Sequence, residues 1–267
     1  MLLYEYIIIV SQTIEKIKSY LGEFMVYITG DMHGCLERLY DKNFRKLKKG
    51  DILIVCGDFG YIFDGGKLEK KVIKFLATRR FVTAFVDGTH DNLKIINKSR
   101  VTYWHGGMVH RISGNLIHLM RGQIFDIEGN RYFAFGGGES PDKDMRLSEG
   151  NWWQEEEPTP NEMAIGAKAL DSVGGKVDYI ITHEPPSLVK SSILLRKGKN
   201  DRVNKLNGYF EEISRFCDFK HWYFGSLHED KVITSHYTCT FKEMYKIEPK
   251  IQNKSKNEAE EKEVVTV

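Results

Sequence analysis

Short apolar runs that alternate with amphipathic stretches are the feature that most constrains what this chain can fold into. Three such runs come first, at residues 25–29, 51–56 and 81–86, and helix-like stretches at 36–47 and 68–78 separate them. Continuous apolar runs of this length are typical of buried strands. Because strands alternate with helices, the pattern predicts an α/β sheet. Sites in such sheets gather beyond the carboxyl ends of the strands.

The first run ends in a pair of residues that suits a metal ion. Asp31 and His33 follow Gly30, and residues two apart in an extended chain point the same way. A carboxylate oxygen and an imidazole nitrogen can therefore converge on one cation. Taken alone, a turn and a surface histidine explain the pair better. A metal site is favoured because the next two runs end in similar residues, in Gly57-Asp58-Phe59-Gly60 and Gly88-Thr89-His90-Asp91-Asn92.

The middle of the chain changes character. Short β-like runs joined by glycine-containing turns indicate consecutive hairpins, at residues 108–112, 116–120, 123–127 and 131–135. A glycine triplet at 136–138 follows, and then a long polar loop that contains Trp152 and Trp153. A loop this long in a compact domain is usually functional, so we expect the two tryptophans to form a lid over the site rather than plain core.

Two further strand-like runs carry histidines at their ends. Residues 177–181 lead into Thr182-His183-Glu184-Pro185-Pro186, and residues 222–224 lead into Gly225-Ser226-Leu227-His228. Helices are predicted at 160–173 and 203–217, and two more strands within 232–247, with residues 237–239 between them. Five junctions that join a strand end to an acidic residue or a histidine therefore occur along the chain.

Composition narrows the class of protein. The chain has 267 residues, of which 41% are hydrophobic, enough for one large domain or two small ones. A net charge of +2 points to neither nucleic acid nor an anionic membrane as a partner. The cysteines form no C-x-x-C pair, and we interpret all four as reduced thiols of a cytoplasmic protein. They are Cys35, Cys56, Cys217 and Cys239.

The two ends of the chain are predicted to lie outside the domain at 25–247. The apolar start of residues 1–24 is too short to span a bilayer, and it lacks the features of a signal peptide. One hypothesis is that translation begins at Met25, and the other is that residues 1–24 form an accessory arm. From residue 248 to 267 the chain is rich in Lys, Glu and Asn without aromatic residues, which predicts a disordered tail.

Taken in order, the five junctions resemble the calcineurin-like metallophosphoesterase family. The family pattern is D-x-H, then G-D, then G-N-H-[DE], then a histidine, then G-H-x-H, and the resemblance covers roughly residues 25–240. It implies a β-sandwich flanked by helices in αββα layers, with a dinuclear centre of Mn, Fe, Zn or similar ions at the sheet edge. It also implies a hydrolase that cleaves a phosphorylated substrate, a phosphate mono- or diester, by attack of a metal-activated water.

The resemblance implies a role for each matching residue. Asp31, His33 and His228 would hold the first metal, Asp58 would bridge to the second, and His183 would belong to the second. An anionic carboxylate suits the bridge, because it must screen two cations from each other. His90 would sit beside the phosphate and could protonate the leaving oxygen, with Asp91 as its partner.

This chain departs from the family pattern at three positions. Thr89 replaces an asparagine and Ser226 replaces a histidine, and both positions ligate the second metal in the family. Hydroxyl groups are poorer ligands, so the second site is expected to be the weaker. Tyr61 stands where an acid or amide commonly orients the catalytic histidine. These departures keep open the alternative of a degenerate, weakly active or inactive member that binds a phosphorylated ligand or a protein. A nuclease-like role is disfavoured for extended duplexes by the near-neutral charge.

Other polar residues are candidates of lower rank. Lys143 and Arg146 could contact phosphate, although an exposed charge is the default interpretation. Backbone amides of the glycine triplet could cradle phosphate. The remaining histidines match no motif and are interpreted as surface or hydrogen-bonded core residues: His105, His110, His118, His221 and His236.

Overall fold

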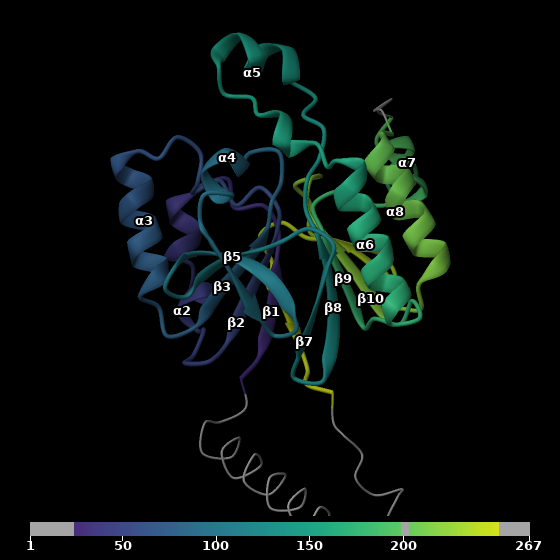
Figure 1. The fold of residues 1–267 in the computed structure, drawn as a ribbon, viewed down its shortest axis with the longest axis horizontal. Helices are drawn as coiled ribbons and strands as arrows, with labels where there is room; N and C mark the ends of the chain where they lie inside the picture. The colour runs from purple at the N-terminus through teal and green to yellow at the C-terminus, as the bar shows by residue number, and fades with distance from the viewer. Residues whose placement is uncertain (1–23, 199–202, 251–267) are drawn as a thin grey trace, which may run out of the picture.

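Two β-sheets pack face to face, and helices cover their outer faces (Figure 1). The computed structural model describes residues 24–198 and 203–250. Residues 1–23 and 251–267, where the extension and most of the tail were predicted, lie outside the described residues. The layers follow the αββα order that the resemblance implied, and the predicted fold class is confirmed.

The first sheet has seven strands in the order β13-β1-β2-β3-β6-β5-β4. Strands β1, β2, β3 and β6 are parallel, whereas β13 and the β4–β5 hairpin run antiparallel to their neighbours. The bounds are β1 Val26–Thr29, β2 Ile52–Cys56, β3 Val82–Val86, β4 Arg100–Trp104, β5 Gly107–Ser113, β6 Leu116–Leu119 and β13 Tyr245–Ile247.

The second sheet has six strands in the order β11-β12-β10-β9-β8-β7. The four central strands are parallel, and β7 and β11 close the two edges in the antiparallel sense. The bounds are β7 Gln123–Ile127, β8 Asn130–Phe135, β9 Tyr179–Thr182, β10 His221–Phe224, β11 Lys231–Thr234 and β12 Tyr237–Cys239.

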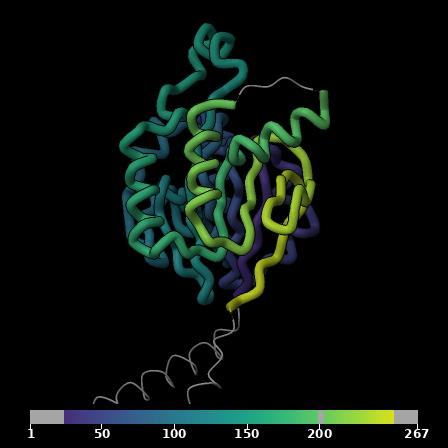
Figure 2. The backbone as a smooth tube through the Cα atoms, turned by 90° about the vertical axis from the view of Figure 1, so that its right-hand side faces the viewer, coloured from purple at the N-terminus to yellow at the C-terminus, as the bar shows by residue number. Residues whose placement is uncertain are grey.

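Helices α2, α3 and α4 lie beside the first sheet, and α6, α7 and α8 lie beside the second (Figures 1 and 2). Helix α5 stands apart at the top of both views. Among the described helices, none combines the length and the apolar character needed to cross a membrane. The bounds are α2 Lys42–Arg45, α3 Lys67–Ala77, α4 Leu93–Ile96, α5 Lys143–Glu149, α6 Pro160–Ser172, α7 Ser187–Arg196 and α8 Lys205–Phe216, with 3-10 helices at Leu36–Leu39 (η1) and Gln154–Glu156 (η2).

Strand β2 shows why the strands of the first sheet are apolar at every position. Ile52, Ile54 and Cys56 belong to the core between the two sheets. Leu53 and Val55, which point to the other face, belong to the core under α3. Because side chains alternate across a strand, a strand covered on both faces must be apolar at every position. A third core joins the outer face of the second sheet to α6, α7 and α8.

The predicted series of hairpins is wrong at one step, because β6 and β7 belong to different sheets. The N–H of Met120 donates to Met108 in the first sheet, whereas the N–H of Gly122 donates to Ala134 in the second. The chain changes sheet between these residues. Gly122 has φ +75°, and a Cβ there would lie 2.7 Å from the backbone of Gly166, so the crossing requires glycine.

Some helices also differ from prediction. The single helix expected at 36–47 is broken into η1 and α2, because the side chain of Asp41 accepts from the N–H of Asn43 and starts a new helix. Helix α7 and strand β4 were not predicted, and the long polar loop contains α5 and η2. Glu248 and Lys250, assigned to the disordered tail, bond to Asn130 and Asp178. The four cysteines are free, as expected.

A buried polar cluster lies just beyond β3. Both carboxylate oxygens of Asp87 are used, by Arg121 Nη2 at 2.6 Å and by His118 Nε2 at 3.0 Å. Burial alone would raise the pKa of Asp87, but Arg121 and His118 outweigh it and hold that pKa well below its usual range. His110 Nδ1 continues the cluster, 3.0 Å from His118 Nδ1.

We predict that His110→Gln reduces the pH dependence of stability. Burial, and then His118, lowers the pKa of His110 from 6.5 to about 4. Between these two pH values the unfolded chain binds a proton at His110 that the folded chain does not. Through this group the free energy of unfolding is therefore highest above pH 6.5, and it falls by on the order of 1–3 kcal/mol toward pH 4. Chemical denaturation at pH 7.5 and 4.5 measures the change. His236→Gln, at an exposed histidine, is the control. If both variants lose the same free energy of unfolding between pH 7.5 and 4.5, His110 is not the group responsible.

Candidate active site

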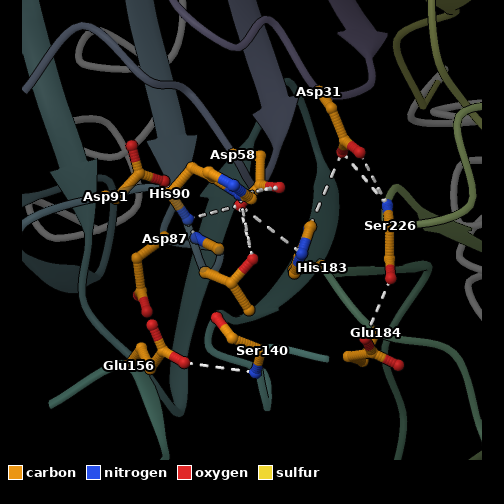
Figure 3. A network of polar contacts seen from close by, with 12 residues as sticks. Asp31, Asp58, Asp87, His90, Asp91, Ser140, Glu156, His183, Glu184 and Ser226 are labelled. Carbon is orange, nitrogen blue, oxygen red and sulfur yellow. Dashed lines mark hydrogen bonds and ion pairs between the residues drawn. The ribbon is translucent and has the colours of Figure 1, made fainter. Parts of the chain in front are cut away.

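The carboxyl ends of strands from both sheets meet at one place. Asp31 and Asp58 each follow a strand of the first sheet by two residues, and His90 follows β3. From the second sheet, His183 follows β9 and Ser226 follows β10. Figure 3 shows these five side chains gathered in one network. The strand ends that carried the sequence motifs are therefore neighbours in space.

Four of the predicted ligands converge as expected. One donor atom from each of Asp31, His33, Asp58 and His228 can be chosen so that all lie within 4.8 Å of one another. The two histidine Nε2 atoms are 2.8 Å apart, and His228 Nε2 is 3.2 Å from Asp31 Oδ2. Donors bonded to one ion at about 2.0–2.3 Å lie at most about 4.6 Å apart, so a bound ion would draw the widest-spaced donors slightly closer than the 4.8 Å that bounds them here. Two carboxylates and two imidazoles thus fit a single divalent ion such as Mn, Fe or Zn.

The backbone is bent to make this convergence possible. Six non-glycine residues in the described chain have positive φ, and four of them are in the site: His33 (47°), Asp58 (40°), Ser226 (68°) and His228 (52°). Such conformations are sparsely populated and persist only where surrounding contacts hold them, and they cluster at functional sites. Their concentration here is a second indication that the strand ends form a working site.

Two of the motif glycines are required by close approach. A Cβ on Gly225 would lie 2.0 Å from Asp31 Oδ1, and a Cβ on Gly88 would lie 2.2 Å from Asp58 Oδ1. Both distances are far inside contact, so any larger residue would displace a carboxylate. The glycine before each polar cluster therefore makes room for a side chain from a neighbouring strand.

The position expected for a second metal is less complete. His183 Nε2 lies 3.6 Å from Asp58 Oδ1, and Thr89 Oγ1 lies 3.4 Å from the same oxygen. The hydroxyl of Ser226 is directed at Glu184 and donates to Oε1 at 2.8 Å (Figure 3). Within 24–198 and 203–250, no third histidine, cysteine or acid completes a ligand group with Asp58 and His183. The weaker binding of a second metal stays a prediction, and these contacts are the geometry on which it rests.

The partner of Ser226 belongs to a buried ion pair that sequence reasoning missed. Glu184 Oε2 accepts from Lys190 Nζ and from Asn207 Nδ2, each at 3.0 Å. All three side chains are buried. Glu184 belongs to a junction motif and could have been proposed from the sequence. Its partner Lys190 lies on α7, a helix that was not predicted. The acidic side chain beside the position expected for a second metal is therefore already paired with a lysine.

The charges of the cluster favour a cation. Burial opposes protonation of His183, but the carboxylates of Asp58 and Asp31 outweigh it and raise the pKa of His183 well above its usual range. Burial likewise opposes ionisation of Asp58, but His183 and His90 outweigh it and hold the pKa of Asp58 far below its usual range. The buried carboxylate of Asp58 thus stays ionised and needs positive charge nearby, which a bound metal would supply.

His90 and Asp91 do not form the predicted pair. His90 Nδ1 lies 3.0 Å from Asp58 Oδ2, and its backbone N–H donates to the other oxygen of that carboxylate at 2.8 Å. Asp91 accepts backbone N–H bonds from Phe59, Gly60 and Gly88, at 2.8–3.1 Å. Burial, and then the charge of Asp58, raises the pKa of Asp91 to about 7. Asp91 holds two strand-end loops together, and Asp58 is the partner of His90.

The candidates for phosphate contact in residues 136–157 are placed differently from one another. Arg146 is buried, and its guanidinium bonds to Glu156 Oε2 at 3.1 Å and to the Ser140 hydroxyl. Lys143 is partly exposed and pairs with Glu157 at 2.6 Å. The amides of Gly137 and Gly138 donate to backbone carbonyls, so the glycine triplet has no free pair of amides to cradle phosphate. Only Lys143 keeps an accessible charge.

The two tryptophans anchor the segment that carries α5. Trp152 Nε1 donates to Glu156 at 2.7 Å, and the Trp153 ring packs edge-on against Phe63 with centroids 4.9 Å apart. Both are half-buried. Trp153 holds the segment against the loop after β2, and Trp152 bonds within the segment. Whether the segment acts as a lid stays a prediction.

We predict that Arg146→Met lowers the free energy of unfolding by about 3 kcal/mol, because it leaves the buried Glu156 carboxylate without its partner. Arg146→Met with Glu156→Gln should recover part of that loss, since the uncompensated charge is then gone. Urea denaturation measures both. A contact of Arg146 with substrate phosphate instead would leave stability unchanged and raise only KM.

Comparison with known families agrees with this geometry. The family model described as calcineurin-like phosphoesterase matches residues 24–230, which include all five junctions. A search of curated proteins found no match. Members of the matched family normally bind divalent metals, as the cluster of Asp31, His33, Asp58 and His228 would allow. The chain belongs to the calcineurin-like phosphoesterase family.

Proposed function

We propose that this protein is a metal-dependent phosphoesterase that hydrolyses a phosphate mono- or diester. The observation that carries the proposal is the convergence of donor atoms from Asp31, His33, Asp58 and His228 within 4.8 Å of one another. His90 lies beside them, with its Nε2 not used by any contact in the described structure. A divalent ion held there would supply Lewis acidity, neutralise charge on phosphate oxygens and lower the pKa of a water. The family supports the same reaction class.

His90 is the proposed proton donor to the leaving oxygen. Its Nδ1 is held by Asp58, and no contact in the described structure uses its Nε2. The side chain is 39% exposed, so Nε2 is accessible to a substrate. The hydrogen bond to Asp58 is the main cause that raises the pKa of His90, which favours a proton on the ring near neutral pH. Asp58 is therefore proposed as the positioning residue, in the role first assigned to Asp91.

A binding protein without turnover is the second candidate. Thr89 and Ser226 favour it, because the hydroxyl of Ser226 is committed to Glu184 and the second metal position keeps only Asp58 and His183. The first metal position nevertheless retains all of its ligands, and this favours catalysis by a single tightly held ion. The four free thiols support a reducing compartment such as the cytoplasm, which we also propose.

We predict that His228→Gln reduces bound metal and hydrolysis together. Purified protein loaded with Mn²⁺ should hold at least one ion per chain, and the variant should lose at least about tenfold in affinity, since one of four ligands is removed. Elemental analysis after dialysis gives the stoichiometry, and a nitrophenyl phosphodiester gives the rate. His236→Gln is the control, because this histidine is exposed and contacts the carbonyl of Lys220 just before β10, at the end of that strand opposite the site. Tight metal binding in His228→Gln would contradict the ligand assignment.

We also predict that Thr89→Asn combined with Ser226→His raises both the second-ion occupancy and the rate. The change supplies an amide oxygen and an imidazole where the protein has two neutral hydroxyls. Calorimetric titration with Mn²⁺ should change from one strong site to two. If the starting protein already holds two ions tightly and the double change alters neither quantity, other residues complete the second site and this interpretation is wrong.

A further inference from the structure

Two cavities meet at His90, and they differ in chemistry. One is lined by residues of α3 and the other by Lys190 of α7, and these two helices flank opposite sheets (Figure 1). His90 is the residue that their linings share; His33 borders the first, and His228 borders the second. Because these two ligands are 2.8 Å apart, the proposed metal position lies at the boundary between the cavities.

The α3 cavity, of about 500 Å³, has an apolar wall. Leu36, Tyr61, Phe63 and Leu68 form this wall, and the charged residues Asp64, Lys67 and Glu69 complete the lining. Its rim is preformed, because the carboxylate of Glu69 accepts the backbone N–H groups of residues 63–65 at 2.8–3.0 Å. A cavity of this size and character suits a small apolar or aromatic group.

Contact with the segment that carries α5 further fixes this wall. The ring of Phe63 packs against Trp153, with centroids 4.9 Å apart. The hydroxyl of Tyr61 donates to the carbonyl of Cys35, so that this ring also has a fixed place. The position at which Tyr61 replaces an acid or amide therefore adds an aromatic surface next to His33 and His90, where the family pattern has a polar group.

The α7 cavity, of about 570 Å³, has a lining with more polar and charged side chains. Lys143, Ser140 and Asn204 line it together with the Glu184–Lys190 pair. Each cavity is by itself within the range that holds a small ligand. A phosphate monoester has one organic group and would leave one cavity to solvent. A phosphodiester has two organic groups, one for each cavity.

We propose that the substrate is a phosphodiester whose one arm is apolar or aromatic and binds in the α3 cavity, while the other arm is polar and binds in the α7 cavity. This inference rests on the proposed phosphoesterase function. In the reaction, the oxygen of a water bonds to phosphorus and the P–O bond to one arm breaks. That arm leaves as an alcohol with a proton from His90, and the proton that the water loses restores His90. The products are one alcohol and one phosphate monoester.

Two comparisons on the Mn²⁺-loaded protein test this inference. The first is the kcat/KM for bis(4-nitrophenyl) phosphate against 4-nitrophenyl phosphate, and we expect the diester to be favoured by at least about tenfold. The second uses Leu68→Gln, at a residue that lines the α3 cavity and is 59% exposed, so that folding is spared. Leu188→Gln is the matched control, since Leu188 is 64% exposed on α7 and lines neither cavity.

Leu68→Gln should raise KM for the diester by about 3- to 10-fold with little change in kcat, because it weakens an apolar contact that is present both before and during the reaction. Calorimetry with diphenyl phosphate should show the same loss in affinity, and Leu188→Gln should show neither effect. Equal or better cleavage of the monoester would overturn the two-arm substrate and leave the phosphoesterase function standing. Equal effects of the two leucine changes would overturn the apolar subsite. Hydrolysis of neither ester by metal-loaded protein would overturn the function and the inference together.

Discussion

Two carboxylates buried at the ends of neighbouring parallel strands are the constraint on which this structure depends. Asp31 is fully buried and Asp58 is 3% exposed. Burying a charge is costly unless it is hydrogen-bonded and paired. The N–H groups of Ser226 and His90 bond to these carboxylates, and His183 lies between them. The nearby histidines compensate the carboxylate charge only in part, and a bound divalent cation would complete the compensation.

The rest of the fold keeps these groups in place. Packing the two sheets face to face brings strand ends from both to one edge, and residues with positive φ then turn their side chains toward a common point. Asp91 joins the loops after β2 and β3 through three N–H bonds, and the buried Arg146–Glu156 pair fixes the segment that carries α5. A site held this rigidly suits the positioning of a phosphate ester, whose hydrolysis depends on preorganised charge.

The parts of the site that sequence could predict are those with a local cause. The strands before Asp31 and Asp58 are continuous apolar runs, and their ends carry the ligands directly. Helix α7 was missed because its apolar residues do not keep to one face, so no helical period is visible. The crossing at Gly122 was missed because the same glycine turn serves a hairpin or a change of sheet. Arg146 was interpreted as an exposed charge or a possible phosphate contact, because its buried pairing with Glu156 depends on a tertiary contact that spacing does not reveal.

The most direct test of the account is a crystal structure of the Mn²⁺-loaded protein with anomalous scattering data. The account predicts a strong peak bonded to Asp31, His33, Asp58 and His228, and at most a weaker one between Asp58 and His183. The height of the second peak relative to the first measures how far the hydroxyls of Thr89 and Ser226 have weakened the second position. A single strong peak elsewhere, or no ordered ion at saturating Mn²⁺, would contradict the claim that these strand ends form a metal centre.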